Sequence, residues 1–243
     1  MNWKLFIGRT LRAAEEKLIG SNASFISKNF PYGRSWTYDL LRIMPQAKTL
    51  IDVGANLGEI SLESRKRYPG SVIYAIEPVA ATFKDLGSKV SKYPNIRPQQ
   101  IALGAEDHVA EILIQADHTV NSLSVAAANG QATEKIVVKT LDGFAAENAL
   151  SQIDVLKIDV EGYENQVLKG AEKLLQKELI KSICIEVGYE RMPAKTHFTD
   201  VDAQLTAHGF VLCGIYDLQR NLVDKRRLWY SNNLYIHQSA LNP

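Results

Sequence analysis

The feature that most constrains the fold is a regular alternation of strand-like and helix-like segments after residue 48. Short apolar runs predict strands, and the segments between them carry apolar residues at helical spacing. The predicted strands cover residues 48–54, 71–78, 95–103, 153–160 and 182–189, and the predicted helices cover 58–70, 79–94, 142–152, 163–180 and 199–209. This alternation predicts an α/β fold with a doubly wound, mostly parallel sheet covered by helices on both faces.

Further segments complete this plan. Residues 210–218 and 227–237 predict a terminal strand pair, which brings the sheet to seven strands with one antiparallel strand, and residues 109–115 and 135–141 predict two extended runs inserted beside it. Residues 49–243 are therefore the predicted main domain, and residues 1–48 a helical N-terminal extension or cap. Within 1–20 the apolar spacing is that of one helix face, which we expect to pack on the domain or to join subunits in a homo-oligomer.

Composition excludes some classes of protein. The net charge is +1, whereas proteins that mainly bind nucleic acid usually carry a strong basic excess, so no nucleic-acid partner is expected. No apolar run approaches the about 20 residues that span a bilayer, and the N-terminus lacks the apolar core of a signal peptide. The two cysteines, Cys184 and Cys213, fall in predicted strands and suggest buried, reduced thiols. We therefore expect a cytoplasmic protein.

A glycine-containing turn follows the first predicted strand. It reads Asp52-Val53-Gly54-Ala55-Asn56-Leu57-Gly58, in which Gly54 allows a tight turn close to a ligand and Gly58 allows close packing of the next helix. Dinucleotide-binding turns read Gly-x-Gly-x-x-Gly, but here Asn56 fills the middle glycine position and the last glycine comes one residue early. Asp52 adds a negative charge just before the turn, which disfavours a phosphate.

The second predicted strand closes with Glu77 and Pro78. A carboxylate at this place can accept hydrogen bonds from both ribose hydroxyls of an adenosine. Together with the turn, it suits an adenosine that carries no diphosphate and has a cationic or zwitterionic tail. S-adenosylmethionine (SAM) fits that description best, with NAD, or a turn that binds no ligand, as the alternatives.

Carboxylates gather where the fourth and fifth strands of the parallel sheet end. Lys157 and Asp159 alternate along the fourth strand, and Glu186 closes its expected neighbour, so both carboxylates flank one mouth. An alcohol acceptor of a methyl group must lose its proton, which Asp159, Glu186 or the loop residue His197 could take, and Lys157 below these carboxylates is a further candidate catalytic residue. The alternatives are a structural ion pair of Lys157 with Asp159 or Glu161, or Mg²⁺ or another divalent cation held by Asp159 and Glu186. Glu161 itself is expected mainly to begin the next helix, where its charge favours the helix dipole.

Several motifs resemble the FkbM-type branch of class I SAM-dependent methyltransferases. They are IDVGANLGEISL, VIYAIEPVAATFKDL, IALGAEDHVAEI, VKTLDGF, DVLKIDVEGYENQVLKGAEKLL and CIEVGYE, in that order between residues 49 and 190. The resemblance implies the strand order 3-2-1-4-5-7-6 and O-methylation of a sugar, glycan or natural product. It implies a SAM site at the first two strands and the backbone after the third, formed by Asp52, Gly54, Ala55, Asn56, Gly58, Glu77, Pro78, Ala102, Leu103 and Asp159.

One residue departs from the family pattern, and one rival function shares the fold. Relatives often carry an Asp where this chain has Asn232, so any role of that carboxylate is in doubt here. A nucleic-acid or protein methyltransferase would have the same fold, but base-modifying members commonly carry Asn-Pro-Pro-Tyr or Asp-Pro-Pro-Tyr where this chain has Asp159-Val160-Glu161-Gly162. The expected acceptor is therefore a small molecule or a glycan.

Overall fold

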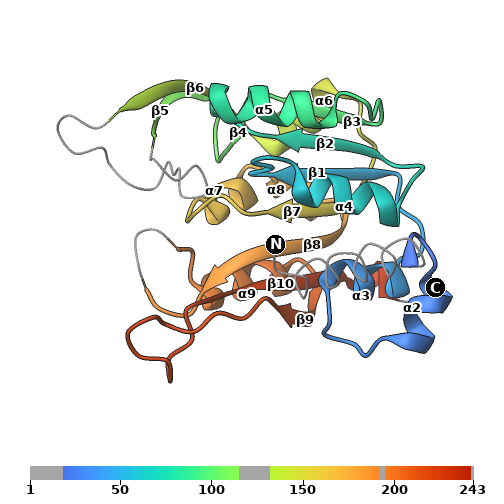
Figure 1. Ribbon diagram of the computed structural model, residues 1–243. Coiled ribbons are helices and arrows are strands. Elements are labelled where there is room, and N and C mark those ends of the chain that lie inside the picture. Colours follow the sequence, from blue (N-terminus) through green and yellow to red (C-terminus); the bar gives the residue numbers. More distant parts are fainter. Residues whose placement is uncertain (1–18, 115–131, 192–194, 242–243) are drawn as a thin grey trace, which may run out of the picture.

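The structure, a computed structural model, describes residues 19–114, 132–191 and 195–241. Its main sheet contains β1 (Thr49–Val53), β2 (Val72–Ile76), β3 (Ile96–Gln99), β7 (Ile153–Ile158), β8 (Ile180–Gly188), β9 (Phe210–Tyr216) and β10 (Tyr230–His237). The strand order is β3-β2-β1-β7-β8-β10-β9 (Figure 1). Strand β10 is antiparallel to β8 and β9, and the other neighbouring pairs are parallel. The doubly wound sheet with one antiparallel strand and the strand order implied by the family resemblance are confirmed.

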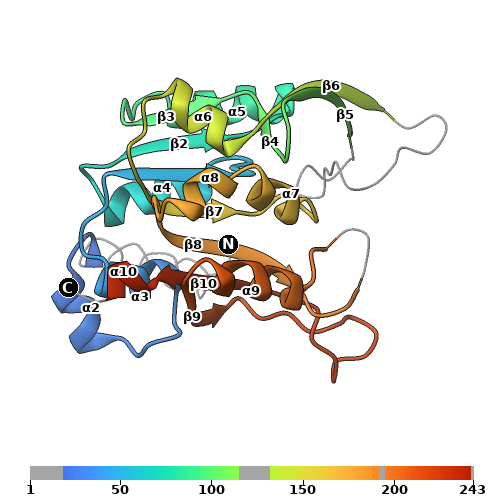
Figure 2. The same ribbon diagram turned by 180° about the vertical axis from the view of Figure 1, so that it is seen from behind.

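Helices cover both faces of this sheet, and each face has its own apolar cluster. One face packs against α3 (Trp36–Ile43), α4 (Glu59–Arg67) and α5 (Ala80–Val90). The other face packs against α6 (Leu141–Glu147), α7 (Glu164–Lys169), α8 (Glu172–Gln176) and α9 (Phe198–Ala207), which lie nearest the viewer in Figure 2. The short helix α10 (Gln238–Leu241) follows β10 directly.

The predicted strand over residues 95–103 is two strands. Strand β3 ends at Gln99, and the chain then leaves the main sheet to form β4 (Ala102–Leu103). With β5 (His108–Leu113) and β6 (Thr133–Lys139), β4 builds a small sheet in the order β4-β6-β5. A third apolar cluster, which includes Ala102, Ile112 and Val138, stabilises this small sheet. Burial of these side chains favours the turn of the chain after β3.

The predicted helix over residues 163–180 is also divided, into α7 and α8. A Cβ atom at Gly170 would lie 1.9 Å from the carbonyl oxygen of Gly104, so the break brings the backbone close to another segment. Asp142 then caps the start of α8, because its carboxylate accepts hydrogen bonds from Lys173 N and Leu174 N, both at 3.0 Å. The apolar face predicted for one long helix is buried in both short ones.

The described part of the N-terminal extension shares a core with the sheet. Helix α2 (Ala23–Asn29) begins at Asn22, whose side chain accepts a hydrogen bond from Phe25 N, and α3 buries its apolar face in the same cluster as β1 and β2. The Tyr216 hydroxyl donates to Asp39 Oδ2 (2.7 Å) and so ties α3 to β9. The amphipathic segment predicted within 1–20, with its proposed role in subunit contact, lies almost entirely outside the described residues.

Two further sequence predictions have structural outcomes. Both cysteines are free; Cys184 is buried as predicted, but Cys213 is exposed because it lies on the edge strand β9. Among the described residues, no helix is both long and apolar enough to cross a membrane.

Candidate functional site

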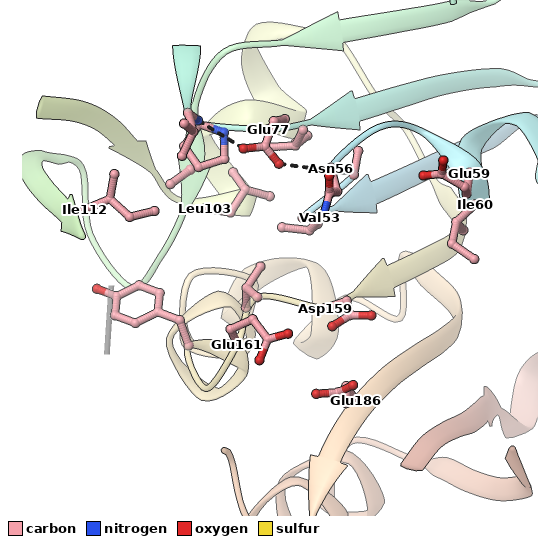
Figure 3. A pocket seen from close by; sticks show the side chains of 18 residues that line it. Val53, Asn56, Glu59, Ile60, Glu77, Leu103, Ile112, Asp159, Glu161 and Glu186 are labelled. Carbon is pink, nitrogen blue, oxygen red and sulfur yellow. Dashed lines mark hydrogen bonds between the residues drawn. The ribbon is translucent and has the colours of Figure 1, made fainter. Parts of the chain in front are cut away.

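A cavity opens at the carboxyl ends of β1, β2, β7 and β8 (Figure 3). Its volume is about 290 Å³. It is lined by Val53, Gly54, Ala55, Asn56, Glu59, Ile60, Ile76, Glu77, Pro78, Val79, Ala102, Leu103, Ile112, Asp159, Val160, Glu161, Tyr163 and Glu186. Ligands of open α/β sheets bind at this edge, so the cavity is the candidate site.

The glycine turn forms one wall of the cavity with its backbone. Gly54 has φ 79°, and a Cβ atom there would lie 1.9 Å from the carbonyl oxygen of Asp159, so a side chain cannot be accommodated. Asn56 also has positive φ (48°), a conformation that Asn tolerates better than most residues. Among the described residues, the buried Asn56 Oδ1 has no hydrogen-bond partner. A polar atom of this kind in a cavity wall is suited to accept a hydrogen bond from a ligand.

Asp52 and Gly58 do not line the cavity, although the family resemblance assigns them to the cofactor site. Asp52 is 4% exposed and accepts a hydrogen bond from the Ser61 hydroxyl (2.6 Å). Burial raises the pKa of Asp52 to about 6, despite the opposing effect of that hydrogen bond. Gly58 packs on α5, because a Cβ atom there would lie 2.7 Å from Leu86 Cδ1. Both residues support the turn from behind the cavity wall.

Glu77 lies at the same end of the cavity and joins two backbone segments. Its Oε2 accepts a hydrogen bond from Asn56 N and its Oε1 accepts one from Val79 N, both at 3.1 Å. The carboxylate is 7% exposed and faces the cavity (Figure 3). Glu77 therefore fixes the glycine turn against the loop after β2 and presents a negative charge to the cavity.

Apolar side chains from the small sheet complete this end of the cavity. Ala102 and Leu103, both assigned from the sequence, line it together with Pro78. Ile112 of β5 also lines it, and sequence reasoning missed this residue. The sequence of the two inserted extended segments does not indicate which strands of the main sheet they lie near, so the contact of Ile112 with the cavity could not be predicted. This apolar slot is suited to an aromatic base.

The other end of the cavity holds three carboxylates. Lys157 pairs with Cys184 and Ile158 with Ile185 in the β7–β8 register, so Asp159 follows beside Glu186. One oxygen atom from each of Asp159, Glu161 and Glu186 lies within 4.8 Å of the other two (Figure 3). The sequence predicted that Asp159 and Glu186 would flank one mouth, and the structure brings them together.

The prediction that Glu161 begins the next helix is wrong. Helix α7 instead begins at Glu164, and Glu161 lies in the preceding turn with φ 52°. The buried Glu164 shapes this turn, because its Oε1 accepts hydrogen bonds from Val160 N and Gly162 N. The turn directs the Glu161 side chain into the cavity.

Lys157 lies below the carboxylates and does not line the cavity. Its ammonium donates to Asn232 Oδ1 (2.6 Å) and to Asp159 Oδ2 (3.2 Å). Burial acts to lower the pKa of Lys157, but the charges of Asp159, Cys184 and Glu186 together with the hydrogen bond to Asp159 outweigh burial, and the pKa is raised. Asn232 is thus a neutral partner of a charged lysine. The geometry makes Lys157 a structural partner of Asp159.

Lys195 is the principal residue that sequence reasoning missed. Its Nζ donates to Glu161 Oε2 (2.8 Å) and forms an ion pair with Glu186 Oε1. Burial, followed by the charge of Asp159, raises the pKa of Glu186 to about 7 even though Lys195 acts in the opposite direction. Burial also raises the pKa of Glu161. Glu161 and Glu186 therefore both have a raised pKa, although both contact Lys195.

His197, predicted as a possible base, lies outside the cavity lining. It is the N-cap residue of α9, where its Nδ1 accepts a hydrogen bond from Thr199 N (3.3 Å). Its ring therefore caps helix α9, two residues after Lys195 in the chain.

The three carboxylates have the ligand type that a divalent cation prefers. The Lys195 ammonium, however, already contacts two of them. The cluster thus has a cationic partner from within the chain, and the donor set gives no independent support for a metal ion.

Comparisons with known proteins agree with this geometry. The family model described as the methyltransferase FkbM domain matches residues 52–212. Methyltransferase 1 of Beauveria bassiana is 26% identical over 189 residues, which cover 69% of this chain and 74% of that protein. The 31-O-demethyl-FK506 methyltransferase FkbM of Streptomyces tacrolimicus is 27% identical over 198 residues, which cover 69% of this chain and 74% of that protein.

A solved structure shares the fold. The methyltransferase FkbM from Methylobacillus flagellatus KT superposes with a TM-score of 0.55 at 17% identity, over 89% of this chain and 50% of that one. This chain therefore spans about half the length of that protein. Because the family model covers most of the chain, including both ends of the cavity, the chain belongs to the FkbM methyltransferase family.

Proposed function

We propose that this chain transfers a methyl group from SAM to a hydroxyl group of a sugar, glycan or natural product. The observation that carries the proposal is that one cavity combines two ends: an end at Glu77 that suits a nucleoside, and an end lined by the carboxylates of Asp159 and Glu186. When bound, SAM supplies a methyl group on a sulfonium, which an alcohol oxygen can attack directly. The protein must then hold both partners, exclude water and remove one proton.

The cofactor end has the groups that SAM requires. Glu77 can accept hydrogen bonds from ribose hydroxyls, because its carboxylate faces the cavity and each carboxylate oxygen can accept more than one hydrogen bond. The buried Asn56 Oδ1 can accept a hydrogen bond from an ammonium group of the methionine part. Leu103 and Ile112 provide apolar contacts for adenine. The residues present therefore fit this cofactor.

The acceptor end has a group suited to take the proton. Glu186 is 7% exposed and has a pKa of about 7, so near neutral pH a substantial fraction is ionised and basic enough to act. Lys195 contacts Oε1 of Glu186, which leaves Oε2 to accept the hydroxyl proton. With SAM bound, the acceptor hydroxyl would receive the methyl group, S-adenosylhomocysteine would be the leaving group, and Glu186 would take the hydroxyl proton. Asp159 can orient the same hydroxyl or its neighbour.

The acceptor class is drawn from chemistry and from the relatives. Carboxylates that converge on one mouth accept hydrogen bonds from several hydroxyls, as a polyhydroxylated acceptor provides. One relative is named for O-methylation of a natural product, which supports the same reaction class here. A nucleic-acid acceptor is disfavoured by the net charge of +1, and a dinucleotide by the Asn in the turn.

Calorimetry with S-adenosylhomocysteine tests the cofactor, and turnover of SAM on a panel of sugars, glycosides and macrolide alcohols tests the acceptor. The expected results are saturable heat that NADH does not displace, and methylation of at least one hydroxyl compound. Absence of heat, or tighter binding of NADH than of the nucleoside, would remove the proposal. Methylation of an RNA in preference to every hydroxyl compound would instead support the alternative function, a nucleic-acid methyltransferase.

A further inference from the structure

Residues 195–197 lie beside the end of β8, where Lys195 contacts two carboxylates of the acceptor end from outside the cavity lining. Gly188, the last residue of β8, donates a hydrogen bond from its N–H to the carbonyl oxygen of Thr196 (2.7 Å). A Cβ atom at Gly188 would lie 2.9 Å from Lys195 Cβ, so the missing side chain of this glycine makes room for the lysine stem. The contact between Gly188 and Thr196 therefore places the Lys195 side chain next to Glu186, which lies two residues before Gly188.

The Lys195 ammonium has partners on three sides. It contacts Glu161 Oε2 at 2.8 Å and Glu186 Oε1, and it lies 4.8 Å from the centre of the Tyr230 ring. The side chain is 12% exposed. A partly desolvated ammonium between two carboxylates and an aromatic face is held more firmly than a surface lysine.

We propose that Lys195 is the built-in cation of the acceptor site, taking among these carboxylates the role that a divalent metal ion has in a metal-dependent site. The inference rests on the proposed function, and it makes Lys195 a positioning residue that acts through Glu161 and Glu186. Methyl transfer then requires no added divalent cation.

The pairing of charges supports this role. Lys157 neutralises Asp159, and Lys195 neutralises Glu161 and Glu186, so every carboxylate of the cluster has a lysine partner. A metal ion would need one oxygen from each of these carboxylates and would compete with the ammonium for the same atoms. Without Lys195, two partly buried carboxylates would repel each other, and Glu186 would lose the contact that favours its ionised form.

Substitution of Lys195 tests the inference through the rate of methyl transfer. Lys195→Met should lower kcat by about 10- to 100-fold with little change in affinity for S-adenosylhomocysteine, because a charged contact to the base is lost while the Glu77 end stays intact. Lys195→Arg should recover part of this rate, because it keeps the charge. The matched control is Lys139→Met, which removes a lysine–glutamate pair outside the cavity and should leave the rate unchanged. EDTA should not affect the wild type.

Binding of Mn²⁺, followed by electron paramagnetic resonance, gives a readout that needs no acceptor. The wild type and Lys139→Met should bind Mn²⁺ weakly, whereas Lys195→Met should bind it at least about tenfold more tightly, because Glu161 and Glu186 then lose the ammonium that competes with a metal ion for their oxygen atoms. Lys195→Met/Glu186→Gln should lose the gained affinity. If Lys195→Met does not fold, as judged by thermal unfolding, Lys195→Gln takes its place.

Three outcomes would overturn the inference: equal Mn²⁺ affinity with and without the lysine, a Lys195→Met enzyme with the wild-type rate, or a wild-type rate that EDTA abolishes and Mg²⁺ restores. Failure of the proposed function looks different. It would appear as no methylation of any hydroxyl compound, while the Mn²⁺ measurement would still decide the role of Lys195.

Discussion

The two ends of the cavity are built in different ways. The end at Glu77 is made mainly of backbone, apolar side chains and one carboxylate that two backbone N–H groups hold in place. The end at Glu186 is made of three carboxylates from separate segments, and two lysines outside the cavity lining, Lys157 and Lys195, form ion pairs with them. One end is fixed by local hydrogen bonds, and the other by ion pairs between separate segments.

This difference indicates a division of work between binding and reaction. A rigid backbone cradle suits a cofactor that every turnover shares, because its shape does not depend on protonation. A cluster of coupled charges suits proton removal, because small changes in its partners shift the pKa of the base. Substitutions at the two ends should therefore separate cofactor affinity from the rate of methyl transfer.

The largest separation is expected for Glu186→Gln. The amide keeps the size of the side chain but cannot take a proton, so kcat should fall by about 10²- to 10⁴-fold. Affinity for S-adenosylhomocysteine should stay within about twofold, because the Glu77 end is untouched. Single-turnover transfer and calorimetry on the same samples measure both quantities.

Glu190→Gln is the matched control for this change. Glu190 lies four residues later and pairs with Arg227 outside the cavity, so its loss should leave kcat near the wild-type value. An equal fall in both variants, or a large loss of nucleoside affinity in Glu186→Gln, would break the division between the two ends.

Glu77→Ala tests the opposite end. Two charge-assisted hydrogen bonds to ribose are worth about 3 kcal/mol or more, so Kd for S-adenosylhomocysteine should rise by about two powers of ten. Loss of the contacts to Asn56 N and Val79 N adds to the effect. The control is Glu134→Ala, which removes another glutamate that accepts a backbone N–H, at Ala80, but does not line the cavity. Unchanged affinity in Glu77→Ala would show that the nucleoside binds elsewhere.

The pH dependence of kcat/KM is a third and smaller effect. Glu186 must be ionised to accept a proton, and burial raises its pKa to about 7, so activity should fall about tenfold per pH unit below that value. Removal of Lys195 should move this limb to higher pH, because the lysine favours the ionised carboxylate. Nucleoside affinity should not follow the same curve. A profile that is flat from pH 5 to 8 would exclude Glu186 as the base.

The sequence predicted the two ends of the cavity unequally, for a physical reason. Gly54, Asn56 and Glu77 could be found because the backbone conformation and the strand end are local properties of a short motif. Asp159 and Glu186 followed from the parallel register of neighbouring strands. Lys195 could not be found this way, because its position depends on the contact of Thr196 with Gly188 at the end of β8, which no local motif signals. Asp52 and Gly58 lie close in sequence to the cavity wall, yet face away from it.

His197 gives the smallest expected effect and distinguishes support of the acceptor end from chemistry within it. His197→Ala removes the side chain that accepts from Thr199 N at the start of α9, so the free energy of unfolding should fall by about 1 kcal/mol. His197→Ser restores a capping oxygen and should recover most of that stability. Both variants should keep kcat within about twofold, measured beside thermal unfolding, because the imidazole lies outside the cavity lining. A hundredfold fall of kcat in His197→Ser, with stability restored, would contradict this expectation. It would indicate that the imidazole accepts the proton and that Glu186 has a structural role.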